Sequence, residues 1–226
     1  ELHESEGKEV EVAHAWQRAH GAHLVDARGA DAAIRVDARA RGEAREPMAE
    51  HLAHARAHLE QFHFAGPLIT DDGTAPIGTM CIIEMPDRKA AAAFAAGDGY
   101  AKAGMLEPPQ IIRFVSSKRL KQHDREPDPD QQLFVCECID GPDAATLRPT
   151  VAAEHHAYQG SIIDRYLAHG PLRTDDGKGL VGSLFLIEAP DRAAAEKIVA
   201  DEPMTGAGVF SEVRITRWRL GKSISP

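Results

Sequence analysis

Two stretches of this chain are nearly identical: "AGPLITDDG" at residues 65–73 and "HGPLRTDDG" at residues 169–177. The offset of 104 positions between Pro67 and Pro171 holds without a gap from Ala49/Ala153 to Phe114/Trp218. Roughly a third of the paired positions are identical, which indicates an internal repeat. A chain of 226 residues is long enough for two domains of about 100 residues, each with its own core. The sequence therefore predicts two copies of one module.

The second copy shows the order of its elements most clearly. "QLFVCECID" (132–140) alternates and predicts a strand, and residues 143–167 have apolar residues at helical spacing. A short strand at "HGPL" and a turn at "RTDDGKG" precede a buried strand at 180–189. Asp191 then caps a helix, and 210–220 is a closing strand. This β-α-β-β-α-β order predicts a ferredoxin-like α+β module, with both helices on one face of an antiparallel sheet.

The first copy follows the same order, with its first strand placed at "AAIRVDARA" (32–40). The predicted organisation has four parts: an N-terminal arm or extra helix at 1–21, a first module at 22–118, a charged, proline-bearing linker at 119–132, and a second module at 133–226.

Each predicted sheet has one face without helices. Strands such as "LFVCECI" and "LVGSLFLI" make that face apolar, and an apolar face of this size is not stable in water. We therefore expect the two modules to pack sheet to sheet within one chain, as an intramolecular pseudo-dimer.

Charge and cysteine content exclude several classes of partner. The net charge is −9, so nucleic acid and anionic membranes are poor partners. The apolar runs are strand-sized, far short of the roughly 20 residues of a membrane span. Three cysteines cannot form a full disulfide framework, which favours a reducing, cytoplasmic location; Cys136 and Cys138 are expected in the core. No flavin, haem or nicotinamide motif is recognisable, and no cofactor is expected.

Several motifs resemble those of the YCII-like family of dimeric α+β barrel proteins. They are His51 and His155, each fifteen residues before the glycine of "GP"; "IGT" and "VGS" at 77–79 and 181–183; and "GDGYAKAGMLE" and "DEPMTGAGVFSE". The resemblance implies that the two modules form an intramolecular dimeric α+β barrel. It also implies a site centred on histidine and aspartate, and the family includes members that eliminate HCl from chlorinated hydroxylated rings.

The resemblance implies a catalytic pair of His51 and Asp98 in the first copy. In the second copy His155 matches, while the acid is Glu202, or Asp201 displaced by one position. Gly99 replaces the usual proline, Met204 stands at the position of Tyr100, and the family's Arg-Pro is missing from its expected place before the histidine in both copies.

A histidine paired with a carboxylate can act as a general base near neutral pH. We therefore expect a cofactor-independent lyase or isomerase acting on a small cyclic or unsaturated oxygenated metabolite. The alternatives are histidines that are only hydrogen-bonded structural residues, or a non-catalytic barrel that binds a small molecule or serves as an accessory protein. The candidate substrate-binding residues are His54, Asp72, Thr79, Tyr100, Tyr158, Asp176 and Ser183.

His51, His54 and His58 lie at i, i+3 and i+7, which places them on one helix face. Such a face could hold Zn²⁺, which makes a metal-dependent enzyme a further alternative. A polar cleft wall is the preferred interpretation, and no metal ligands are assigned. Whether the pseudo-dimer pairs again as a homodimer is left open by the sequence.

Overall fold

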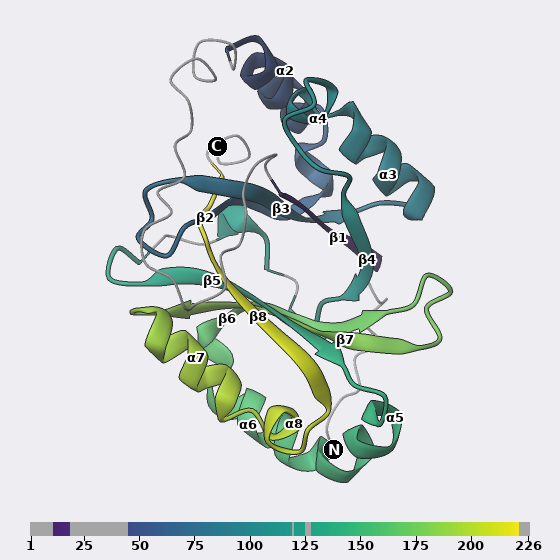
Figure 1. Ribbon diagram of the computed structural model, residues 1–226, viewed down its shortest axis with the longest axis vertical. Coiled ribbons are helices and arrows are strands. Elements are labelled where there is room, and N and C mark those ends of the chain that lie inside the picture. Colours follow the sequence, from purple (N-terminus) through teal and green to yellow (C-terminus); the bar gives the residue numbers. More distant parts are fainter. Residues whose placement is uncertain (1–10, 19–44, 119, 125–127, 222–226) are drawn as a thin grey trace.

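The computed structural model describes residues 11–18, 45–118, 120–124 and 128–221. Its strands form a closed antiparallel barrel in the order β1-β3-β2-β8-β5-β7-β6-β4. The helices cover the outside of the barrel at two opposite ends, as Figure 1 shows. The predicted pair of ferredoxin-like modules, packed sheet to sheet as an intramolecular α+β barrel, is confirmed.

The first half contributes β1 (Glu11–Arg18), β2 (Phe62–Ile69), β3 (Pro76–Glu84) and β4 (Gln110–Val115). Its helices are α2 (Arg45–Arg56), α3 (Arg88–Gly97) and the short α4 (Gly99–Lys102), with a 3-10 turn, η1 (Leu59–Gln61), before β2. A second 3-10 turn, η2 (Gln122–Asp124), lies in the predicted linker. There, Gln122 is buried and joins the Ala65 N–H to the Gly221 carbonyl.

The second half contributes β5 (Gln132–Asp140), β6 (Tyr166–Arg173), β7 (Leu180–Ala189) and β8 (Phe210–Trp218). Its helical elements are α5 (Ala144–Leu147), η3 (Arg148–Val151), α6 (Ala152–Ser161), η4 (Ile163–Arg165), α7 (Arg192–Ala200) and α8 (Pro203–Gly206). The side chain of Asp191 caps α7 by accepting from the Ala194 N–H, as the sequence predicts.

The single helix expected over residues 143–167 is wrong. It is divided into α5, η3, α6 and η4, and its last two residues belong to β6. Pro149 lies at the start of η3, where it can donate no backbone hydrogen bond and disfavours helical geometry in the residue before it. The division separates Arg148 from α6, and this matters for the site below.

The first strand of the barrel also differs from expectation. Residues 11–18, expected in an arm, form β1, which pairs with β3 and β4 as β5 pairs with β7 and β8. The strand expected at 32–40 lies outside the described residues. Propensity does not decide between two segments that can both form a strand, since the pairing partners are distant in sequence.

The barrel interior is one apolar cluster shared by both modules. It includes Phe64, Phe114, Leu172 and Trp218, together with other buried side chains of β2 to β7. The two seams between modules are short: Leu68 faces Trp218 across β2 and β8, and Phe114 faces Leu172 across β4 and β6. Burial of this shared interior therefore provides most of the apolar contact between the modules.

The repeated "GPL" lies at these seams. A Cβ atom on Gly66 would lie 2.0 Å from the Arg219 carbonyl oxygen, and one on Gly170 would lie 1.9 Å from that of Val115. Both distances are far too short for a non-bonded contact, so each glycine lets the strand end of the other module approach. The motif occurs twice because the barrel has two seams between the modules, and a glycine of this motif lies at each.

The repeated "DDG" joins the modules on the outside. Asp71 accepts from Arg192 at 2.6 Å, and Asp175 accepts from Arg88 at the same distance. The carbonyls of the two aspartates accept from Arg217 and Arg113. These paired contacts cross between modules in both directions and follow the same pseudo-twofold relation as the repeat.

Within the described ranges, no helix has the length and apolar character needed to cross a bilayer. Cys136 and Cys138 are free thiols. Cys136 and Cys138 are fully buried in the core on the helix-facing side of the second sheet, and burial raises the pKa of both thiols.

Candidate active site

Each module places a histidine of its longer helix against an acid that begins a short helix. In the first module, His51 on α2 has its Nδ1 atom 2.5 Å from Oδ2 of Asp98. In the second, His155 on α6 has its Nδ1 atom 2.5 Å from Oε1 of Glu202. The structure therefore brings together the two pairs that the sequence singled out.

The acid of each pair is fixed by a second contact. Asp98 caps α4, with its other oxygen accepting the Tyr100 N–H at 2.9 Å, and Glu202 caps α8 by accepting the Met204 N–H at 3.1 Å. Burial would raise the pKa of Asp98, but the hydrogen bond and charge of His51, with the Tyr100 N–H, hold it below its ordinary value. The acid is thus held ionised and oriented toward the ring.

The sequence left two candidates for the acid of the second module. Glu202 is 1% exposed and faces His155, whereas Asp201 points outward and binds Lys197 at 2.7 Å. The longer side chain of Glu202 still forms the contact that Asp98 forms in the first module. The choice depends on how α7 ends, because Asp201 is the last-turn residue that closes that helix.

In each pair the Nδ1 atom faces the carboxylate, which leaves Nε2 to present a lone pair. Among the described residues, Nε2 of His51 and of His155 has no hydrogen-bond partner. The His51 side chain is 25% exposed and that of His155 is 11% exposed. Both rings can therefore meet a substrate, and the second is the more enclosed.

The residues around the two pairs differ. Tyr100 stacks on His51 with ring centroids 4.7 Å apart. At the equivalent position, the Met204 sulfur instead accepts a hydrogen bond from Arg148 at 3.3 Å. The two sites share the His-carboxylate pair, called the dyad below, but differ in the side chain at the position of Tyr100 and Met204.

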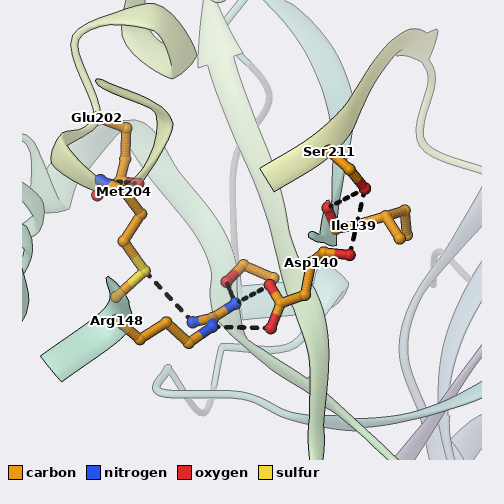
Figure 2. A network of polar contacts seen from close by, with 7 residues as sticks. Ile139, Asp140, Arg148, Glu202, Met204 and Ser211 are labelled. Carbon is orange, nitrogen blue, oxygen red and sulfur yellow. Dashed lines mark hydrogen bonds and ion pairs between the residues drawn. The ribbon is translucent and has the colours of Figure 1, made fainter. Parts of the chain in front are cut away.

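Arg148 is a functional candidate that sequence analysis missed. Its guanidinium forms a two-pronged ion pair with Asp140, at 2.6 and 2.9 Å, and reaches Ser183 Oγ at 3.2 Å (Figure 2). It also lies 5.5 Å from the centre of the Phe210 ring. The signal in the sequence is the dipeptide Arg148-Pro149, which stands six residues before His155 rather than directly before it.

Two predicted substrate-binding side chains instead tie helices together. His54 Nε2 donates to the Phe94 carbonyl at 2.9 Å, and the Tyr158 hydroxyl donates to the Ile198 carbonyl at 2.8 Å. Both bonds link the longer helix of a module to the next one at equivalent positions. Burial lowers the pKa of His54 and raises that of Tyr158 to about 12. The His54 Nε2–H and the Tyr158 O–H are therefore already donated to backbone carbonyls within the fold.

The hydroxyls and turn aspartates also have partners within the fold. Thr79 Oγ1 donates to the Gly66 carbonyl at 3.3 Å, while Ser183 belongs to the Arg148 network. Asp72 accepts from Thr70 and Thr74, and Asp176 accepts from Thr174 and the Lys178 N–H. These bonds lower the pKa of both turn carboxyls. The structure does not bring Asp72 or Asp176 to either dyad.

Of the three histidines expected on one helix face, His51 and His54 lie on α2, which ends at Arg56, and His58 follows it. The three side chains do not converge as metal ligands. His51 faces Asp98, His54 donates to Phe94, and His58 Nδ1 contacts the His54 carbonyl at 2.9 Å. In the described part of the chain, no three His, Cys, Asp or Glu side chains are grouped so as to hold a metal ion. Each of the three rings is instead engaged separately, so the metal-dependent alternative gains no support from this geometry.

Solved structures similar to this chain fall into two groups. A 5-chloro-2-hydroxyhydroquinone dehydrochlorinase from Burkholderia phenoliruptrix AC1100, in complex with 2,5-dihydroxybenzoquinone, is 29% identical over 40% of this chain and 96% of its own, with a TM-score of 0.37. A candidate chlorite dismutase matches 95% of this chain and 96% of its own at 14% identity and a TM-score of 0.56. A heme-binding protein from Thermus thermophilus matches 93% and 92% at 13% identity and a TM-score of 0.54. The two long matches share the fold.

The search of curated protein sequences found no match to this chain. The model of the YCII-related domain matches twice, at residues 26–115 and 132–219, which together make up more than half of the chain. The two matches correspond to the two halves of the barrel and to its two His-carboxylate pairs. The chain therefore belongs to the YCII-related domain family, of which it carries two copies in tandem.

Proposed function

We propose that the protein is a cofactor-independent lyase or isomerase that acts on a small cyclic or unsaturated oxygenated metabolite. The observation that carries the proposal is the 2.5 Å contact between a histidine Nδ1 and a fixed carboxylate, present at equivalent positions in both modules. A histidine with a purely structural role has no need of an Nε2 atom that lacks a partner among the described residues. Membership of the YCII-related family supports the same assignment.

The proposed chemistry begins with removal of a proton from carbon. Nε2 of His51 or His155 takes the proton from a carbon next to a carbonyl, and the electron pair of the broken C–H bond moves through the new C=C bond to the carbonyl oxygen, which gives an enolate. Asp98 or Glu202 stabilises the imidazolium that forms. Return of the proton to another carbon gives isomerisation, and expulsion of a leaving group from the neighbouring carbon gives elimination.

A direct test is exchange of carbon-bound hydrogen for deuterium. A panel of small cyclic ketones and hydroxylated unsaturated acids is incubated with the protein in D₂O and followed by proton NMR. We expect catalysed exchange that falls about 100-fold or more when both His51→Ala and His155→Ala are present. The matched control is His156→Ala, an exposed histidine next to His155 on α6.

Binding measurements on the same variants separate catalysis from simple binding. An enzyme keeps its affinity for a compound that it exchanges when the base is removed, but loses the exchange. A binding module shows affinity and no exchange in any variant. Exchange that survives the double histidine variant would refute the proposed mechanism.

A further inference from the structure

Strand β6 carries two buried polar side chains that lack partners. Tyr166 is 0% exposed and His169 is 6% exposed. Within the described residues, the Tyr166 hydroxyl and Nδ1 of His169 form no hydrogen bond. Their rings pack with centroids 4.7 Å apart. Buried polar atoms are almost always hydrogen-bonded, so two neighbouring exceptions indicate a partner that the chain itself does not supply.

Both side chains lie on the helix-facing side of the second sheet, the side against which α7 packs. Tyr166 packs in the cluster that contains Ile162 at the end of α6 and Val199 of α7. The negative charge of Glu202 helps to raise the pKa of Tyr166, and the charge of His155 helps to lower that of His169, after burial itself. The unpartnered atoms are therefore electrostatic neighbours of the second dyad.

Tyr158 and Glu202, whose charges help to raise the pKa of Tyr166, are already engaged in other hydrogen bonds. The Tyr158 hydroxyl donates to the Ile198 carbonyl, and the two oxygens of Glu202 accept from His155 and from the Met204 N–H. None of these can turn to Tyr166 without breaking a bond that it now forms.

The first module shows that the fold does not require this pair. The equivalent positions hold Phe62 and Ala65. Phe62 is buried and packs edge to face against Phe94, with ring centroids 5.6 Å apart. Apolar side chains can therefore fill these two positions of the fold without leaving a buried polar group unpaired. At these two positions the second module is therefore polar where the first is apolar.

We propose that Tyr166 and His169 bind an oxygen atom of a small enol, phenol or ketone, and that the second module therefore holds the oxygenated substrate. This inference rests on the proposed function of the dyad. When His155 takes a proton from carbon, the electron pair of the C–H bond moves to that oxygen. The Tyr166 O–H and the Nδ1–H of a neutral His169 then donate to the developing enolate.

Phenols test this assignment because a phenolate resembles an enolate. Phenol and 4-nitrophenol are titrated into the unaltered protein, followed by proton NMR and by the absorbance of 4-nitrophenolate. We expect one molecule bound per chain, with affinity about tenfold or more weaker in Tyr166→Phe and in His169→Ala. These two changes recreate the side chains found at the same positions of the first module, so the variants should fold.

Ser161→Ala is the matched control, since it removes an exposed hydroxyl of the same module that donates to the Tyr158 carbonyl. It should leave phenol affinity unchanged. No saturable binding to the unaltered protein at millimolar phenol, which would leave only water beside the pair, would overturn the inference. Equal affinity in the unaltered protein, Tyr166→Phe and His169→Ala would also overturn it.

The outcome is separable from that of the proposed function. If Tyr166→Phe and His169→Ala weaken phenol binding while deuterium exchange is unchanged in the variant that lacks His51 and His155, the binding site stands and the catalytic proposal fails. If deuterium exchange requires His155 while Tyr166→Phe and His169→Ala bind phenol as tightly as the unaltered protein does, the catalytic proposal stands and this inference fails.

Discussion

The Nδ1 atom of His155 lies 2.5 Å from Oε1 of Glu202, a carboxylate that is almost completely buried. The same contact occurs 104 residues earlier, between His51 and the more exposed Asp98. One geometry is thus maintained by acids of different length. The second copy is more enclosed, so its electrostatic interactions are less screened by water.

Replacing the Glu202 carboxylate by an uncharged amide should remove the catalytic activity of the second dyad. In a His51→Ala background, we expect Glu202→Gln to reduce deuterium exchange about 100-fold or more, because an amide cannot stabilise the imidazolium or fix the same tautomer. Proton NMR measures the rate. The matched control is Asp201→Asn, which removes the neighbouring carboxylate that binds Lys197. Equal effects of the two changes would contradict the assignment of Glu202 as the acid.

Removing Arg148 should destabilise the second module strongly. Its side chain and that of Asp140 are 11% and 10% exposed, so Arg148→Ala leaves a nearly buried carboxylate without its partner. We expect a loss of about 3 kcal/mol in the free energy of unfolding, measured with urea. Arg192→Ala breaks an exposed ion pair of the same length and should cost less than about 1 kcal/mol. Similar losses would show that the Asp140 pair is solvated.

The seam glycines should not tolerate a methyl group. We expect Gly66→Ala and Gly170→Ala each to lower the free energy of unfolding by about 3 kcal/mol, since the new Cβ would collide with the backbone carbonyl of Arg219 or Val115. Gly160, on α6, has open space around it. Gly160→Ala should be neutral or stabilise by up to about 1 kcal/mol. Harmless substitution at either seam would mean that the barrel closes differently.

Stability should fall as the pH is lowered from 6.5 toward 4, in part because of His169. Burial lowers the pKa of His169 to about 4, helped by the charges of Lys118 and His155. In this window the unfolded chain binds a proton at His169 that the folded chain does not, so acid favours unfolding. The contribution of this residue is roughly 3 kcal/mol across the window.

The measurement for His169 is the free energy of unfolding at several pH values, in the unaltered protein and in His169→Ala. The substitution should reduce the pH dependence of stability between 6.5 and 4. Parallel curves would show that His169 is protonated normally in the folded protein.

The turn aspartates should matter for stability rather than for turnover. Asp72 and Asp176 hold their turns through bonds to Thr70, Thr74, Thr174 and the Lys178 N–H. We expect Asp72→Ala and Asp176→Ala to lower the melting temperature and to leave kcat and KM for deuterium exchange unchanged. A rise in KM without a change in kcat would instead indicate that Asp72 and Asp176 bind the substrate, as the sequence analysis expects.

The sequence by itself determined the parts of this protein that depend on local pattern and on the repeat. Alternation predicts β5, a continuous apolar run predicts β7, and an aspartate after a proline starts α7. The constant offset predicts two modules with the same fold. The candidate positions of both dyads followed from the same offset and from the family motifs. These features are readable because their causes lie within a few residues or repeat at a known distance.

The tertiary structure decided whatever depends on contacts between distant segments. It placed residues 11–18 in the barrel as β1, chose Glu202 over Asp201, and brought Arg148 to Asp140 and Ser183. It also left the hydroxyl of Tyr166 and Nδ1 of His169 buried without partners in the described chain. The sequence does show the substitution of histidine for alanine before "GPL", but not that the ring is enclosed. Burial and pairing are properties of the closed barrel, because they arise only when strands far apart in the chain come together.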